Sequence, residues 1–174
     1  MRKIYIQTVL CAALIASYGC NNQQSGTETK DSTAVAAEAS VPVTTFKDSK
    51  ADSIYQGYIN LKNALVANNE EDAKQASATL EGILKSTNDS LVVQAGKINA
   101  AASIADKRLA FNDFTENILK EIRTQVSSGT IYKQYCPMAN DGKGGFWLAS
   151  EKEIKNPYYG EAMLSCGTVE EEIK

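Results

Sequence analysis

The chain has no histidine among its 174 residues, and this absence excludes several classes of site. A ferritin-like di-iron site takes Glu-x-x-His pairs from its helices, so a helical protein without histidine cannot build one. Serine hydrolases use histidine as their general base, and the motifs of these enzymes and of metallohydrolases are missing here. C-x-x-C pairs, which thiol oxidoreductases normally carry, are missing as well. We therefore expect a protein that is not an enzyme.

A surplus of positive charge is also lacking. The chain has 18 basic and 21 acidic side chains, which give a formal net charge of −3. Binding to a nucleic acid or to an anionic membrane surface normally needs a basic stripe. We expect neither, so any membrane attachment has to come from another feature of the chain.

That feature is the only long apolar run, which lies at the start of the chain. It extends from Tyr5 to Ala16, follows two basic residues and stops four residues before Cys20. This layout predicts a bacterial lipoprotein signal peptide over residues 1–19, with a lipid on Cys20. The run is too short to remain as a membrane span. Cleavage near Ala16, with Cys20 left as a free thiol, is the alternative. With the lipid, the protein would be anchored in the bacterial cell envelope and face the periplasm.

The next segment, residues 20–48, is rich in Asn, Gln, Ser, Thr and Ala and has no apolar periodicity. Such a composition cannot bury a core and predicts a flexible tether. The remaining residues, 49–174, are enough for one compact domain.

Within residues 49–129, apolar side chains recur at steps of three and four, as on one face of a helix. Asp113 and Glu116 are spaced like a capping box at the start of the last helix. The pattern predicts a mainly α fold, an antiparallel four-helix up-down bundle over residues 49–129. The four stripes are Ile54, Tyr58, Leu61 and Leu65; Ala73, Ala76, Leu80 and Ile83; Leu91, Ala95, Ile98, Ala102, Ala105 and Leu109; and Phe114, Ile118, Ile122 and Val126.

Beyond Gly129 the sequence changes character, and we expect residues 130–174 to form a small C-terminal module packed on the bundle. Residues 130–135 are β-branched and aromatic, residues 140–145 are rich in glycine, and residues 146–148 are apolar again. This order predicts a short β-hairpin.

A second prediction for this module concerns Asn156 and Pro157, which read as a helix cap followed by proline in the first helical position. One or two helical turns over residues 158–166 should follow and end at Gly167.

Four sulfur side chains lie in this module, and they are our candidates for a metal site: Cys136, Met138, Met163 and Cys166. Residues two apart in a strand, or three apart in a helix, point the same way, so each pair can converge. Thiolates and thioethers together suit Cu(I) better than harder metals. The spacing alone is not specific, because neither cysteine belongs to a C-x-x-C zinc knuckle.

A disulfide between Cys136 and Cys166 is the alternative, since an exported protein meets an oxidising compartment. It would close a loop of about 30 residues and stabilise the fold by roughly 3–4 kcal/mol in the chain-entropy model. The methionines would then be core residues that fill gaps. The two interpretations are compatible, because a reduced pair could bind metal and an oxidised pair release it.

Aromatic residues cluster in sequence around these sulfurs. Tyr135, Trp147 and Tyr158 are candidates for the wall of a pocket, or for covering a bound metal by cation–π contact. The alternative is that they form the core of a small β-containing module.

The tail resembles one known family. The residues that carry the resemblance are Tyr135-Cys136-Pro137-Met138-Ala139, Gly145-Phe146-Trp147-Leu148, Asn156-Pro157-Tyr158-Tyr159-Gly160 and Met163-Leu164-x-Cys166-Gly167. They are similar to domain-of-unknown-function family 3347, with the resemblance extending over residues 50–174. Such domains occur in secreted bacterial proteins and attached to periplasmic adaptor subunits of heavy-metal efflux pumps. Where many members carry a histidine, this chain has Tyr135, so one candidate ligand is absent.

The resemblance implies a role near copper or heavy-metal efflux, with an efflux adaptor or another envelope protein as partner. We therefore expect a lipid-anchored periplasmic protein that binds a soft metal, Cu(I), and buffers it or passes it on. The alternative is an envelope interaction module without enzymatic activity, whose tail is held by the Cys136–Cys166 disulfide.

Overall fold

The computed structural model describes residues 43–174, so the predicted signal peptide, the lipid on Cys20 and most of the predicted tether lie outside the described residues. The α-helices are α1 (Ser49–Val66), α2 (Glu70–Leu84), α3 (Asp89–Ala100), α4 (Ile104–Ile122) and the short α5 (Ala139–Gly142). Two 3₁₀ helices are η1 (Arg123–Gln125) and η2 (Gly160–Met163). The strands are β1 (Thr45–Phe46), β2 (Val126–Ser128), β3 (Ile131–Cys136), β4 (Gly145–Ala149) and β5 (Thr168–Ile173).

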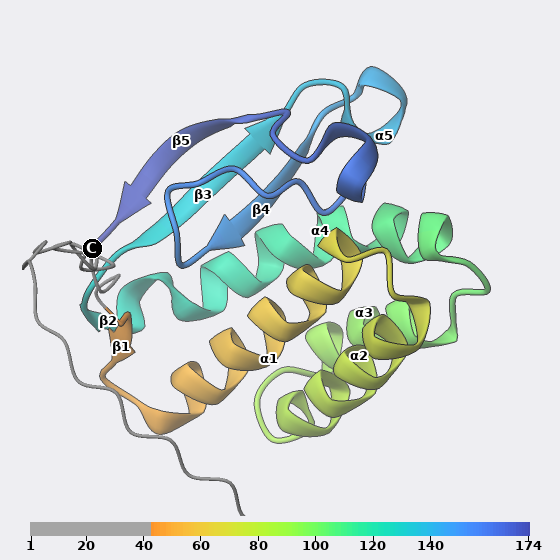
Figure 1. The fold of residues 1–174 in the computed structure, drawn as a ribbon. Coiled ribbons are helices and arrows are strands. Elements are labelled where there is room, and N and C mark those ends of the chain that lie inside the picture. The colour runs from red at the N-terminus through yellow and green to blue at the C-terminus, as the bar shows by residue number, and fades with distance from the viewer. Residues whose placement is uncertain (1–42) are drawn as a thin grey trace, which may run out of the picture. The chain divides into compact units, whose positions relative to one another are not determined.

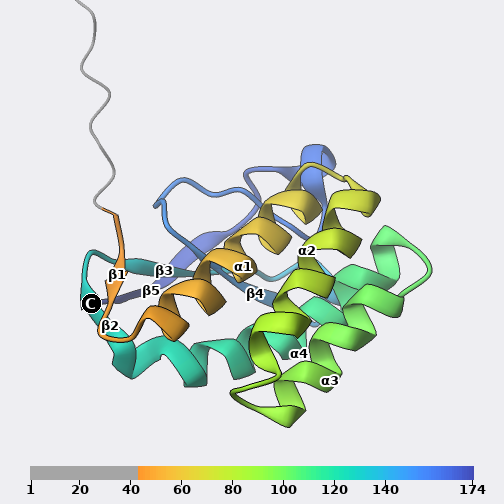
Figure 2. The same cartoon turned by 90° about the horizontal axis from the view of Figure 1, so that it is seen from below.

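The fold is mainly helical and carries antiparallel strands at its C-terminal end, as the sequence predicts. A sheet of β3, β4 and β5 lies over α1 and α4, while α2 and α3 lie on the side of these helices away from the sheet (Figures 1 and 2). Both α4 and α1 contact β4. In residues 43–174, no helix combines the length and the apolar character that crossing a bilayer requires.

Each of the four long helices starts at a polar residue that caps it. The side chains of Asp48, Asn69, Asn88 and Ser103 each accept a hydrogen bond from a backbone N–H in the first turn. Such caps satisfy N–H groups that have no partner within the helix. Local sequence therefore sets where these helices begin.

The boundary between the third and fourth helices differs from the prediction. The apolar stripe from Leu91 to Leu109 suggested one continuous helix, but the chain leaves the helical conformation at Ala101 and restarts after Ser103. Asp113 and Glu116, predicted to start the fourth helix, lie in the middle of α4. The predicted core positions Ala102, Ala105 and Leu109 are exposed. The stripe was misleading because small apolar residues kept the helical spacing across the break.

A buried lysine stabilises this break. Lys107 is 1% exposed, and its ammonium group donates to the carbonyl oxygens of Ile98, Asn99 and Ala101 at 3.0, 3.2 and 2.9 Å. The last carbonyls of a helix have no partner within it and carry partial negative charge. Lys107 satisfies those of α3 from the first turns of α4.

The end of the predicted tether is ordered differently from expectation. Thr45 and Phe46 form β1, which pairs antiparallel with β2. Thr44 is buried, and its hydroxyl donates to the carbonyl of Thr130 at 2.9 Å. Residues 43–48 therefore belong to the folded part rather than to a tether.

The predicted hairpin is present, and a strand that was not predicted extends it. β3 pairs antiparallel with β4, with Gln134 opposite Trp147, and it also pairs antiparallel with β5, with Tyr135 opposite Thr168. The sheet order is β4-β3-β5, so β3 is the central strand.

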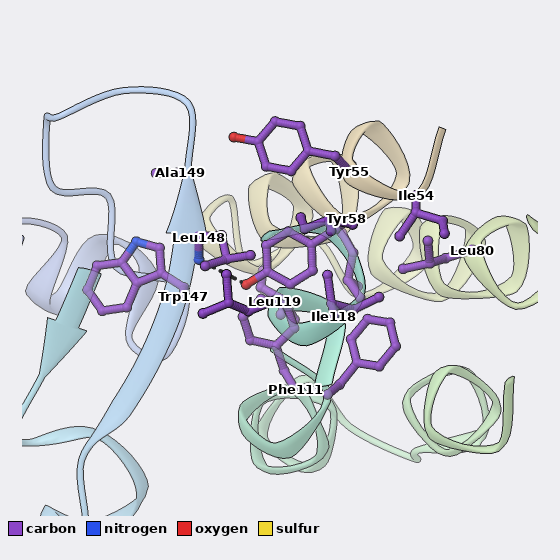
Figure 3. Packing of buried hydrophobic residues seen from close by; sticks show 14 of the residues in the cluster. Ile54, Tyr55, Tyr58, Leu80, Phe111, Ile118, Leu119, Trp147, Leu148 and Ala149 are labelled. Atoms are coloured by element: carbon purple, nitrogen blue, oxygen red, sulfur yellow. Dashed lines mark hydrogen bonds between the residues drawn. The ribbon is translucent and has the colours of Figure 1, made fainter. Parts of the chain in front are cut away.

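Strand β4 is covered on both faces. Leu148 points toward the helices, where the Tyr58 hydroxyl accepts a hydrogen bond from its backbone N–H at 3.1 Å (Figure 3). Trp147 points away from the helices. On that outer face, the amide nitrogen of Gln134 donates to the carbonyls of residues 151, 152 and 153 at 3.0 to 3.3 Å. The segment after β4 therefore covers the outer face, and Trp147 is completely buried there.

Candidate functional site

The pairing of β3 with β5 brings the two cysteines together. Tyr135 lies opposite Thr168 in the last pair of this ladder. Cys136, which follows Tyr135, and Gly167, which precedes Thr168, therefore leave the ladder side by side. Gly167 is so close to β3 that a Cβ atom on it would lie 2.9 Å from the carbonyl oxygen of Tyr135. As a result, the sulfur atoms of Cys136 and Cys166 are 3.0 Å apart, although the residues are 30 positions apart in sequence.

This sulfur–sulfur distance suits two different states of the pair. Both cysteines are free thiols in the structure. A disulfide would bring the sulfurs to about 2.05 Å. Two thiolates on one tetrahedral ion, with bonds of about 2.3 Å as for zinc, would lie about 3.8 Å apart. The observed 3.0 Å lies between these values, so either state requires the sulfurs to move by less than about 1 Å.

The two thiols differ in their surroundings. Cys136 is 0% exposed on the central strand, whereas Cys166 is partly exposed in the loop before β5. The contact with the Cys136 thiol, together with some burial, raises the pKa of the Cys166 thiol above its ordinary value. Since the thiolate is the metal ligand, binding of a metal here would release protons.

The two methionines lie beside the thiols along the chain and are exposed. Met138 is 54% exposed, and its carbonyl accepts a hydrogen bond from the hydroxyl of Tyr159. Met163 is 37% exposed, and its carbonyl accepts a hydrogen bond from the N–H of Cys166 at 3.0 Å. The structure thus brings the two thiols into contact, and it leaves the two methionine side chains exposed at positions close to the cysteines in sequence.

Residues 43–174 contain no group of three or more Cys, Asp or Glu side chains placed to hold one metal ion. Within the described part of the chain, a site built on the two thiols would take further ligands from the thioethers. Water or a group of a partner protein could supply the rest. This ligand set is soft and favours Cu(I).

Asn156 positions Cys166, a role that the sequence did not reveal. It is completely buried, its side-chain amide donates to the carbonyl of Cys166 at 2.8 Å, and its backbone N–H donates to the carbonyl of Leu164 at 2.8 Å. Its side-chain oxygen also accepts from the N–H of Tyr158, as the predicted cap does. Only the four residues of η2 are helical in this segment. The Asn-Pro signal marked the turn but not the contact with Cys166.

The three aromatic residues predicted near the site have different surroundings. Tyr135 is half-buried, with its ring centroid 4.6 Å from that of Phe146. Trp147 is buried, and its ring meets that of Tyr158 edge-on at 6.2 Å. Tyr158 also donates to the carbonyl of Phe146 at 2.6 Å and helps to line a hollow of about 290 Å³ beside Arg108 and Tyr159.

Part of the chain matches a known family. Residues 54–129, from α1 through β2, match the family described as Protein of unknown function (DUF3347). The matched range is shorter than the resemblance expected over residues 50–174, and it ends before Cys136. No curated protein and no solved structure matches the chain.

Proposed function

We propose that this protein, whose residues 54–129 belong to the DUF3347 family, binds a soft metal ion, Cu(I), through Cys136 and Cys166, which follow the matched range. The observation that carries the proposal is the 3.0 Å contact between the two thiols. Exposed thioethers on both flanks, from Met138 and Met163, supply further soft ligands.

In this proposal the metal is cargo rather than a cofactor of a reaction. The protein acts without enzymatic activity as a lipid-anchored component on the periplasmic side of the cell envelope, within copper or heavy-metal homeostasis. An efflux adaptor or another envelope protein receives the ion. We further propose that α1 to α4 form the antiparallel up-down bundle expected from the sequence, which supports β4.

The proposed Cu(I) site is tested by titrating the full reduced chain with Cu(I) in competition with a chromophoric Cu(I) chelator. We expect the Cys136→Ser, Cys166→Ser double variant to lose the tight site that the parent has. Ser165→Ala, which changes an exposed neighbour of Cys166, serves as the matched control and should bind like the parent. All proteins compared also carry Cys11→Ser and Cys20→Ser, so that the thiols at positions 136 and 166 are the ones whose loss is measured. Equal affinity of the parent and the double variant would rule out the proposed site.

The thioethers are tested separately. Leucine has nearly the volume of methionine and offers no sulfur, so Met138→Leu and Met163→Leu remove a ligand with little effect on packing. We expect each variant to bind Cu(I) more weakly than the parent and more tightly than the double cysteine variant. An unchanged affinity in both would leave only the thiols as ligands.

The same contact also favours a second function, in which the tail is held by a disulfide and the protein acts as an interaction module. A 3.0 Å separation needs only a small movement to become a covalent bond. This alternative predicts that the chain, isolated without reductant, contains the Cys136–Cys166 disulfide, which peptide mapping by mass spectrometry detects. It further predicts no stoichiometric Cu(I) binding after reduction.

A further inference from the structure

We propose that Cys166 is a site of thiol–disulfide exchange with small disulfides, and that Cys136 is the thiol that resolves the resulting adduct. The dithiol then closes into a disulfide in a defined order. The consequence for metal binding rests on the proposed function, whereas the order of the two steps does not.

The first step is assigned to Cys166 because it is the more accessible thiol. It follows η2 in a segment whose residues 161–165 are all exposed, so a small molecule can approach from this side. Cys136 lies on the central strand between β4 and β5 and is 0% exposed. A reagent can reach Cys136 only after the surrounding structure opens.

The second step is assigned to Cys136 because of its distance from Cys166. Its sulfur is already 3.0 Å from the Cys166 sulfur, so it can attack an adduct there without any rearrangement of the strands. The side-chain amide of Asn156, bonded to the Cys166 carbonyl at 2.8 Å, holds the loop in this position. An adduct on Cys166 should therefore be short-lived in the parent protein.

The reaction transfers two electrons from the protein to the small disulfide. The Cys166 thiolate attacks one sulfur of the small disulfide, which forms a mixed disulfide and releases one small thiolate. The Cys136 thiolate then attacks the Cys166 sulfur, which breaks the mixed disulfide and releases the second small thiolate. The two protons of the protein dithiol end on the two released thiols, so one disulfide is formed and one is reduced.

Oxidation removes both thiolates from the metal site at once. Under the proposed function, the protein therefore binds Cu(I) only in its reduced state, and a disulfide-rich environment releases the ion. The partly exposed thiol makes this change accessible to small disulfides without unfolding of the chain.

The test uses the full chain and hydroxyethyl disulfide, a small uncharged reagent. The parent, Cys136→Ser and Cys166→Ser proteins are incubated with it, quenched with acid and mapped by mass spectrometry at peptide level. We expect a stable adduct on Cys166 in Cys136→Ser, formed at least about tenfold faster than any adduct on Cys136 in Cys166→Ser, because the latter requires local opening. The parent should form the Cys136–Cys166 disulfide with little adduct.

Two controls establish that the fold causes the difference. In urea-unfolded protein, both single variants should react at similar rates, because burial no longer protects Cys136. Fluorescence of Trp147, the only tryptophan, shows that each variant is folded under the reaction conditions. Equal rates on the two cysteines in the folded variants would overturn the proposal, as would a lasting adduct in the parent without the internal disulfide.

The outcome is independent of the Cu(I) titration of the reduced protein. Ordered exchange without Cu(I) binding would support the two roles and overturn the proposed function. Tight Cu(I) binding with equal reaction at both cysteines would support the proposed function and overturn the order proposed for the exchange.

Discussion

Gly167 is the position at which one methyl group should disturb both the fold and the candidate site. Its backbone φ is +148°, a conformation that residues with a side chain rarely adopt. A Cβ atom would lie 2.7 Å from Cη2 of Trp147 and 2.9 Å from the carbonyl oxygen of Tyr135. Trp147 is completely buried and Tyr135 belongs to the central strand, so neither can yield easily.

The expected loss has two contributions. Backbone strain for a residue with a Cβ atom costs about 1–3 kcal/mol, and the added overlap in a packed region costs a further ~1–3 kcal/mol. We therefore expect Gly167→Ala to lower the free energy of unfolding by roughly 2–6 kcal/mol. Gly142→Ala is the matched control, because Gly142 has a φ of +79° but no atom within 4 Å of the position of a Cβ. It should lose only the strain contribution, about 1–3 kcal/mol.

Urea unfolding followed by the fluorescence of Trp147 measures both variants, since the chain has one tryptophan and it packs against Gly167. Because Cys166 precedes Gly167, the displaced loop should also move the two sulfurs apart. Cu(I) affinity should then fall in folded Gly167→Ala and remain unchanged in Gly142→Ala. Equal unfolding free energies for the two variants would show that the close packing around Gly167 has been misjudged.

Three further predictions concern stability and use the same urea assay. Lys62 is completely buried and paired with Glu151 at 3.0 Å, so Glu151→Gln should destabilise by about 3 kcal/mol by leaving a buried cation unpaired. Burial alone would raise the pKa of Glu151, but the hydrogen bond from Ser150 and the charge of Lys62 outweigh it and hold the pKa below its ordinary value. The ion pair therefore contributes its full stabilisation above about pH 5, and this contribution is lost as the pH falls through the lowered pKa of Glu151. The urea midpoint of the parent should fall over this pH range, and that of Glu151→Gln should not show this fall. Lys107→Met should cost about 2–4 kcal/mol, because three carbonyls at the end of α3 lose their donor, and an unchanged midpoint would contradict that role. Gly82→Ala on an open face of α2 should instead stabilise by about 0.5–1 kcal/mol, and a loss would indicate an unseen contact.

The sequence predicted the helical part of the fold where local signals agreed with packing. The stripe from Ile54 to Leu65 corresponds to buried positions of α1, and a polar cap precedes each long helix. The prediction was wrong at Ala102, because its small side chain continued the helical spacing although the residue is exposed at the break. Burial of Lys62 and Lys107 was not predictable, because the partner of Lys62 is the distant Glu151 and the partners of Lys107 are backbone carbonyls at the end of α3, which no residue type marks.

The candidate site was predicted only in part. Cys136 and Cys166 were selected as a pair, but β5 was missed because three consecutive glutamates within it obscured the alternation of its side chains. That strand sets the distance between the sulfurs. Gln134 holds the segment after β4 on the sheet, and Asn156 holds the Cys166 loop. Both act through backbone carbonyls that no sequence pattern reveals.

By itself, the sequence determined the helical character of residues 49–122, the hairpin and the soft chemistry of the candidate ligands, because periodicity, capping and ligand type depend on residues close together in the chain. Only the tertiary structure decided that the two thiols meet at 3.0 Å, that one is buried and that the thioethers are exposed. The physical reason is the register of β5 on β3, which depends on strand pairing between segments far apart in sequence.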